Sequence, residues 1–248
     1  MYKPIENLNG QVAVITGVNG GFGLAIAKQL ANKGARIIGI VRSNLPLAQE
    51  HMKQLPNAEL NHTAILADVC DGDQLNAARE QITQCDILIT AHGSTKFIPH
   101  QNLSALTDEF FEEMLTVNLR SVYSVIRKFL SLVQASPTGV IITLGSNVSR
   151  AGSGSNMAYA CAKSGSESLV KNLSKFILPA RIVSVNPGAT DTGFMKSAPE
   201  NLFDVAAKTT PLGRCCTPDD VAVTVEAYIT TLRFVTGTSV LVDGGRTI

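Results

Sequence analysis

Short apolar runs alternate along the chain with longer stretches of mixed polarity. The short runs are rich in Val and Ile and predict seven strands, over Val12–Ile15, Ile37–Val41, Thr63–Ala67, Ile87–Thr90, Val140–Leu144, Arg181–Val185 and Ser239–Val242. The longer stretches predict helices, notably over Leu24–Lys33, Leu75–Ile82, Phe110–Leu132, Ala158–Phe176 and Asp219–Thr230. Alternating strands and helices are typical of βαβ units, and strands that are apolar at consecutive positions are buried on both faces. The pattern therefore predicts an α/β fold with an open, doubly wound parallel sheet and helices on both faces, in a single domain over residues 1–248.

The start of the last predicted helix has its own signal. Thr217 is predicted to cap it, with Pro218 and two acidic residues in the first turn. In a doubly wound sheet the ligand crevice lies beyond the carboxyl ends of the strands, so we expect the site residues just after strands.

Composition and charge exclude several classes of function. The chain has 21 basic and 20 acidic residues, which argues against a nucleic-acid or membrane partner. No apolar run is long enough for a membrane span or a signal peptide. The five cysteines are an odd number without metal-site spacing, so no metal site is expected and the thiols are expected to be reduced in the cytoplasm.

A glycine-rich turn follows the first predicted strand. Gly17, Gly21 and Gly23, together with Asn19 and Phe22, lie between that strand and the first helix. Glycines let the backbone turn tightly and approach a pyrophosphate, which the N–H groups of the helix N-terminus then bind. The spacing, preceded by a threonine, resembles that of the short-chain dehydrogenase/reductase family. The resemblance extends from about Asn9 to Gly245 and implies a Rossmann-type fold that binds a nicotinamide cofactor.

The end of the second strand bears on which nicotinamide cofactor binds. An acidic residue there would bind the 2′-hydroxyl of NAD, whereas an arginine accommodates the 2′-phosphate of NADP. Val41 stands where NAD-specific relatives carry Asp, and Arg42 and Ser43 follow it. The sequence therefore predicts NADP(H), with NAD(H) as the alternative. Gly20 is a departure, because some NADP-using relatives carry a second basic residue there.

The resemblance implies further contacts with the cofactor. Asp68 and Val69 match the pair that contacts the adenine, although Asp68 or Asp71 could instead cap the next helix. Where the family usually has Asn-Asn-Ala-Gly, this chain has Thr90-Ala91-His92-Gly93; we expect Ala91 and Gly93 to contact the cofactor and His92 to be packed at the strand end. The segment after the sixth strand resembles the one that contacts the nicotinamide carboxamide, through Pro187, Gly188, Thr190 and Thr192.

Four residues form the candidate catalytic set. Tyr159 and Lys163 lie four apart in a predicted helix, so both side chains point into one cleft, and the cation is expected to lower the pKa of the phenol. Ser146 lies 13 residues before Tyr159 and is expected to stabilise the substrate oxygen. Asn118 matches the asparagine that in this family holds a water in a proton relay to the lysine, although an asparagine that merely bends the helix is the alternative.

These residues predict an oxidoreductase that interconverts a carbonyl and an alcohol. The layout is most similar to the 3-oxoacyl-thioester reductase branch, which includes specialised-metabolite ketoreductases. An alcohol, sugar or steroid dehydrogenase and a non-catalytic cofactor-binding sensor or scaffold are the alternatives.

A segment over residues 193–210 is expected to form a lid over the substrate. It carries Phe194, Met195, Leu202 and Phe203, whereas its Lys196 and Lys208 do not form a dense basic patch. The resemblance also implies a homotetramer in which the helices around 110–132 and 158–176 pack across subunits. A dimer is the alternative.

Overall fold

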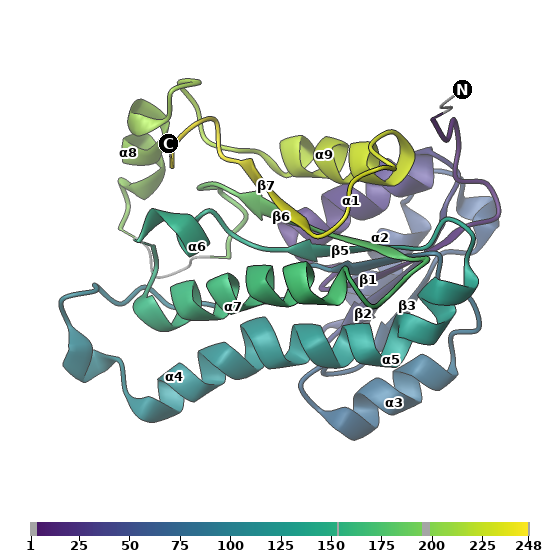
Figure 1. Ribbon diagram of the computed structural model, residues 1–248, viewed down its shortest axis with the longest axis horizontal. Coiled ribbons are helices and arrows are strands. Elements are labelled where there is room, and N and C mark those ends of the chain that lie inside the picture. Colours follow the sequence, from purple (N-terminus) through teal and green to yellow (C-terminus); the bar gives the residue numbers. More distant parts are fainter. Residues whose placement is uncertain (1–3, 153, 195–198, 248) are drawn as a thin grey trace.

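The computed structural model describes residues 4–152, 154–194 and 199–247. One parallel sheet of seven strands, in the order β3-β2-β1-β4-β5-β6-β7, runs through the molecule (Figure 1). The strands are β1 (Val12–Thr16), β2 (Arg36–Val41), β3 (Thr63–Leu66), β4 (Ile87–Thr90), β5 (Val140–Leu144), β6 (Arg181–Pro187) and β7 (Thr238–Val242). All seven predicted strands are confirmed, with bounds that differ by up to two residues.

Helices cover both faces of the sheet. They are α1 (Gly21–Asn32), α2 (Leu45–Lys53), α3 (Gly72–Glu80), α4 (Asp108–Leu115), α5 (Ser121–Ala135), α6 (Val148–Ala151), α7 (Met157–Leu173), α8 (Leu202–Thr209) and α9 (Pro218–Thr230). Alternate residues of a strand face opposite ways, so Ile87 and Ile89 of β4 belong to the core cluster that includes residues of α1, α2 and α9, whereas Leu88 belongs to the cluster that includes residues of α3, α5 and α7. The predicted doubly wound fold, with helices on both faces, is confirmed.

The long helix predicted over residues 110–132 is interrupted. A π-helical turn, Thr116–Arg120, separates α4 from α5 and carries the buried Asn118. Insertions of this kind are frequent at functional sites because one wider turn re-aims a side chain. The sequence pattern did not predict this turn, because all three segments share one helical periodicity.

The order of the strands places the ligand crevice. Both neighbours of β1 are parallel to it, and the chain leaves β1 toward β2 and β3 before it returns to β4 on the other side. The carboxyl ends of β1 and β4 therefore border the switch point at which doubly wound sheets bind ligands. No helix within the described parts of the chain is long and apolar enough to span a bilayer.

Candidate active site

The glycine-rich turn is packed so tightly that side chains would not fit. Gly17 has φ 73°, and a Cβ there would lie 2.9 Å from the carbonyl oxygen of Ala91. A Cβ on Gly23 would lie 2.3 Å from the carbonyl oxygen of Gly17. Gly20 precedes α1, and no side chain caps the helix. The N–H groups at the N-terminus of α1 therefore have no side-chain cap, and their binding of a pyrophosphate stays a prediction.

A cavity of about 380 Å³ opens beside this turn, at the carboxyl ends of β1, β2 and β4. It brings together eight of the cofactor-binding candidates, namely Gly17, Asn19, Arg42, Ser43, Asp68, Val69, Ala91 and Gly93. The Asn19 amide donates to the carbonyl oxygen of Asn44 at 3.2 Å. Asp68 accepts from the Cys70 N–H at 2.8 Å, while Asp71 caps α3. The alternative role for Asp68, as a helix cap, is therefore wrong.

A smaller cavity of about 220 Å³ continues toward α7. Gly21, Phe22, Ala91, Gly93, Lys163 and Thr192 line it. Gly188 and Thr190 line a third cavity, of about 680 Å³. The Thr190 hydroxyl donates to the carbonyl oxygen of Gly188 at 3.0 Å. Pro187 ends β6, and Gly23 packs against Gly17; neither residue lines these three cavities.

Ser146 and Tyr159 also line this third cavity of about 680 Å³. Ser146 follows β5, and Tyr159 lies in the first turn of α7, where the side-chain oxygen of Asn156 accepts from the Tyr159 N–H at 2.7 Å. The amide of Asn156 donates to the Lys96 carbonyl oxygen at 2.7 Å and so fixes this end of α7 to the loop after β4. Sequence reasoning missed Asn156; its signal was an asparagine just before an apolar helical pattern.

The electrostatics around Tyr159 differ from the expectation. Burial raises the pKa of Tyr159 above its ordinary value of 10, and the nearby Ser146 hydroxyl offsets this only in part. The Lys163 ammonium lies 5.6 Å from the centroid of the Tyr159 ring and donates to the Leu144 carbonyl oxygen at 2.7 Å. Burial lowers the pKa of Lys163 to about 8. The prediction that this lysine lowers the pKa of the phenol is therefore wrong for this arrangement, because its ammonium is directed to a backbone carbonyl.

The side chain of Asn118 holds the loop after β4. Its amide donates to the carbonyl oxygens of Ser94 and Met114 at 3.0 and 3.1 Å, and its oxygen accepts from the Ser94 N–H at 3.3 Å. The side chain thus positions the backbone next to Gly93. A relay through Asn118 stays a prediction.

His92 is half-buried and makes two side-chain hydrogen bonds. Its Nδ1 lies 2.6 Å from the Thr16 hydroxyl and its Nε2 lies 2.8 Å from the Ser121 hydroxyl. Because Ser121 donates to the Val117 carbonyl oxygen at 2.7 Å, it accepts from Nε2–H, and Nδ1 accepts from Thr16. Burial, with the positive charge of Lys163, lowers the pKa of His92 to about 3. The imidazole is therefore neutral, and its two hydrogen bonds connect the end of β4 to β1 and α5. It stands at a position where the family usually has asparagines.

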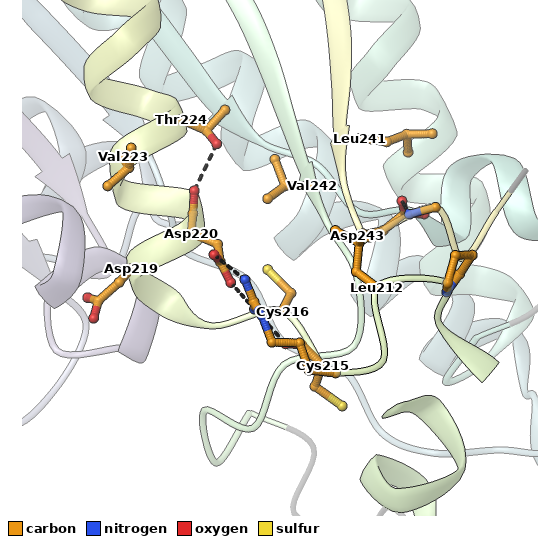
Figure 2. A pocket seen from close by; sticks show the side chains of 14 residues that line it. Leu212, Cys215, Cys216, Asp219, Asp220, Val223, Thr224, Leu241, Val242 and Asp243 are labelled. Atoms are coloured by element: carbon orange, nitrogen blue, oxygen red, sulfur yellow. Dashed lines mark hydrogen bonds and ion pairs between the residues drawn. The ribbon is translucent and has the colours of Figure 1, made fainter. Parts of the chain in front are cut away.

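A larger hollow of about 880 Å³ is bordered by β7, α9 and residues 211–216 (Figure 2), and it shares no described lining residue with the three cavities above. Arg214 and Asp220 line it and form an ion pair at 2.6 Å, and Cys215 and Cys216 line it as free thiols. None of the four candidate catalytic side chains lines this hollow. The candidate active site therefore consists of the three cavities of about 380, 220 and 680 Å³, which share lining residues.

Known proteins resemble this chain over nearly its whole length. The family model described as enoyl-(acyl carrier protein) reductase matches residues 17–247. A putative ketoacyl reductase of the granaticin polyketide synthase of Streptomyces violaceoruber is 29% identical, covering 94% of this chain and 95% of the relative. The 3-oxoacyl-(acyl-carrier-protein) reductase FabG of Vibrio cholerae is also 29% identical, covering 96% and 98%. The crystal structure of a 3-ketoacyl-(acyl-carrier-protein) reductase from Brucella melitensis, complexed with NADH, superposes with a TM-score of 0.86 at 28% identity and covers 98% of this chain and all of that one.

The fold, the glycine turn and the Tyr159–Lys163 pair define an oxidoreductase of the nicotinamide-dependent class, which acts on a carbonyl/alcohol pair. The chain belongs to the short-chain dehydrogenase/reductase family, on the branch of the 3-oxoacyl-(acyl-carrier-protein) reductases. The resemblance drawn from the sequence is thereby confirmed.

Proposed function

We propose that the protein is an NADP(H)-dependent ketoreductase of the 3-oxoacyl or specialised-metabolite type, working in the cytoplasm. The observation that carries the proposal is the placement of Ser146 and Tyr159 on the wall of one cavity, beside the smaller cavity that Lys163 lines. The ketoacyl and 3-oxoacyl reductases among its relatives support the same kind of substrate.

The residues fit a dinucleotide. Gly17, Gly21 and Gly23 leave a cradle in which a Cβ would collide with neighbours at 2.3–2.9 Å. The cavities of about 380 and 220 Å³ lead from Arg42 to Lys163, in the order of the adenosine and nicotinamide ends. When bound, the cofactor supplies the hydride. Arg42 and Ser43 would hold the 2′-phosphate, the N-terminus of α1 the pyrophosphate, and Thr192 the carboxamide end.

The chain's own groups handle the proton. Ser146 and Tyr159 donate hydrogen bonds to the carbonyl oxygen, which gains negative charge as its carbon accepts the hydride. The raised pKa of Tyr159 keeps the phenol protonated near neutral pH, so it is available as the acid that protonates this oxygen. Lys163, Asn118 and water together then return a proton to the phenolate. Oxidation of the alcohol reverses these steps.

The variant Tyr159→Phe tests this assignment. Removing the hydroxyl should lower kcat for ketone reduction by about 1,000-fold, because a general acid contributes roughly a factor of 100 to 10,000. Binding of NADPH should change by less than about twofold. The measurement is NADPH oxidation over a panel of 3-oxoacyl thioesters and cyclic ketones, with Tyr123→Phe, an exposed tyrosine, as the matched control. Activity of Tyr159→Phe close to wild type would refute the role of Tyr159.

Cofactor preference tests Arg42. The wild type should use NADPH with kcat/KM at least about tenfold above that for NADH. Arg42→Ala should raise KM for NADPH by about 30-fold and leave KM for NADH nearly unchanged, because a guanidinium–phosphate pair is a charge-assisted hydrogen bond. A tenfold preference of the wild type for NADH would overturn the assignment of NADP.

We also propose that residues 193–210 form a lid. Phe194 and Leu202 line the 680 Å³ cavity, and the Phe194 ring lies 6.2 Å from that of Tyr159. Phe203 does not line it, and Met195 and Lys196 lie outside the described residues. An apolar wall of this kind suits an acyl chain or a ring.

A further inference from the structure

The charged side chains that line the substrate cavity in the described structure are all positive. Twenty described residues line the 680 Å³ cavity that contains Ser146 and Tyr159. Arg150 and Arg246 are the only charged ones among them, and no carboxylate belongs to this described lining. Phe22, Phe97 and Phe194 supply apolar surface between the polar groups. The cavity thus combines apolar and neutral polar surface with positive charge.

Arg150 is already neutralised. Its guanidinium lies 3.3 Å from the Glu167 carboxylate and also donates to the Ser239 carbonyl oxygen at 3.5 Å. Glu167 is more buried than its partner and binds Ser149 and Asn186 as well, so the pair is part of a network that fixes the turn after Ser146. The positive charge of Arg150 is therefore matched within the protein.

Arg246 has a different environment. The glycines after Asp243 turn the chain back from β7, and the Arg246 N–H donates to the Asp243 carbonyl oxygen at 3.2 Å. Its Nη1 donates to the carbonyl oxygen of Ala206 in α8 at 2.8 Å and to the Thr209 hydroxyl. Both acceptors are neutral, and within the described residues no carboxylate lies within 4.0 Å of this guanidinium.

The remaining donors of Arg246 point to its role. A guanidinium has five N–H donors, and the bonds to Ala206 and Thr209 occupy Nη1. Nε and Nη2 donate to no acceptor in the described part of the chain, and together they form the edge that binds a carboxylate or phosphate through two parallel hydrogen bonds. The side chain is partly buried, so an ion pair there is less screened than at the surface.

We propose that Arg246 is a specificity-determining residue that binds an oxyanion, a carboxylate or a phosphate, carried by the ketone substrate at a point removed from the reacting carbonyl. The proposal rests on the proposed ketoreductase function and narrows its substrate class to anionic ketones. Ala206 and Thr209 hold the guanidinium at the cavity wall before the substrate arrives, which limits the entropy lost on binding.

The test compares matched substrates. A homologous series of straight-chain methyl ketones that end in a carboxylate is assayed with NADPH beside the methyl esters of the same acids. A hydroxyketone phosphate and the free hydroxyketone form a second pair, which separates phosphate from carboxylate recognition. The wild type should favour the anionic member of at least one pair by about tenfold or more in kcat/KM, and the preference should fall with added salt.

Three variants locate the effect. Arg246→Gln should lower kcat/KM for the best anionic ketone by about 30-fold and leave the neutral partner within about twofold, which also shows that the variant is folded. Arg246→Lys keeps the charge but loses the two-point contact, so its activity should be intermediate. Lys208→Gln removes a charge from α8 outside the cavity lining and should leave kcat/KM unchanged for both the anionic and the neutral ketone.

Two results would overturn the proposal: equal use of acids and esters by the wild type, or an equal loss on both in Arg246→Gln. If the wild type turns over no ketone at all, the proposed function fails instead. Calorimetry on the NADPH-loaded protein then decides the role of Arg246, because the acid must bind the wild type more tightly than its ester, and Arg246→Gln must abolish that difference. Equal binding of acid and ester would refute it.

Discussion

His92 shows how one side chain takes over a junction in which the family usually has asparagines. Its two ring nitrogens bond to Thr16 and Ser121, so it can fill both roles only while neutral. A proton on Nδ1 would remove the acceptor for the Thr16 hydroxyl. It would also place a positive charge on His92 close to the ammonium of Lys163. This repulsion is one of the causes that lower the pKa of His92.

This arrangement predicts a loss of stability in acid. In the folded protein burial and Lys163 lower the pKa of His92 to about 3, whereas an unfolded histidine has a pKa of about 6.5. As the pH falls below about 6.5 the unfolded state binds the proton and the folded state does not, so the free energy of unfolding decreases. Between pH 6.5 and 5 the His92 contribution should decrease by about 2 kcal/mol, at about 1.4 kcal/mol per pH unit.

Urea unfolding at several pH values measures this effect. His92→Gln keeps an amide that can hydrogen-bond but does not titrate. The variant should be less stable than wild type at pH 7, and its free energy of unfolding should fall less steeply toward pH 5. If the free energy of unfolding falls equally steeply with pH in the two proteins, His92 does not cause the loss of stability in acid.

Residues with local signals could be predicted, whereas residues defined by distant contacts could not. Tyr159 and Lys163 share a helix, so their spacing alone placed both beside the site. Arg246 could not be found in this way, because its place at the cavity depends on α8, some 40 residues earlier in the chain. The pKa of Tyr159 was predicted in the wrong direction, because burial raises it, and sequence spacing shows neither that burial nor the atom that Lys163 faces.

At the scale of elements, α9 has the most complete start signal of the helices. The Thr217 hydroxyl accepts from the Asp220 N–H at 3.2 Å, and the Asp220 carboxylate accepts from the Thr217 N–H at 2.8 Å. The N-cap that the sequence predicted at Thr217 is thereby confirmed, and Asp220 completes a capping box that satisfies donors at both positions. The helix then buries Val221, Val225 and Ile229 on the sheet face that it shares with α1.

Removing the cap should destabilise the protein without affecting catalysis. Thr217→Ala is expected to lower the free energy of unfolding by about 1 kcal/mol, because the Asp220 N–H loses the hydroxyl that accepts its hydrogen bond and the Asp220 carboxylate loses the same hydroxyl as a donor. kcat/KM should stay within about twofold of wild type, since Thr217 lies outside the substrate cavity. Thermal or urea unfolding measures the loss, and Thr217→Ser should retain most of the stability. An equal loss in the serine variant would show that the methyl group, rather than the cap, is responsible.

The elements that sequence reasoning missed lack such signals. The segment α2 buries only Ala48 and Met52, and α6 has four residues and buries none, so neither has a strong apolar stripe. The π-helical turn at Asn118 is fixed by hydrogen bonds to Met114 and to Ser94 in the loop after β4. Such contacts depend on the packed structure rather than on local periodicity.

At the scale of the whole molecule, the topology followed from the order of strands and helices, because crossovers between parallel strands are right-handed. The switch point at β1 and β4 then placed the glycine turn and the catalytic helix at one edge of the sheet. The substrate cavity did not follow in the same way. Its lining comes from five separate parts of the chain, including the lid and the C-terminal residues, and their packing has no periodic signature.

Subunit association is the last property we propose, as a homotetramer in which α4, α5 and α7 pack across subunits. These helices carry exposed apolar side chains, among them Tyr123 and Met157. Such side chains on helix surfaces favour an interface because association removes them from water. The alternative is a dimer, in which one of the interfaces of the tetramer is lost.

Light scattering at several protein concentrations tests this assembly. The tetramer should have a mass of about 105 kDa, four times the 26.3 kDa of the chain. Tyr123→Glu should lower the mass to that of a dimer or a monomer, because it would bury a carboxylate in an apolar contact beside a second copy of itself. Leu66→Glu, at an exposed position on the edge strand β3, should leave the mass unchanged. A wild-type mass of one chain would exclude both the tetramer and the dimer, and a tetrameric Tyr123→Glu would show that α5 lies outside the interface.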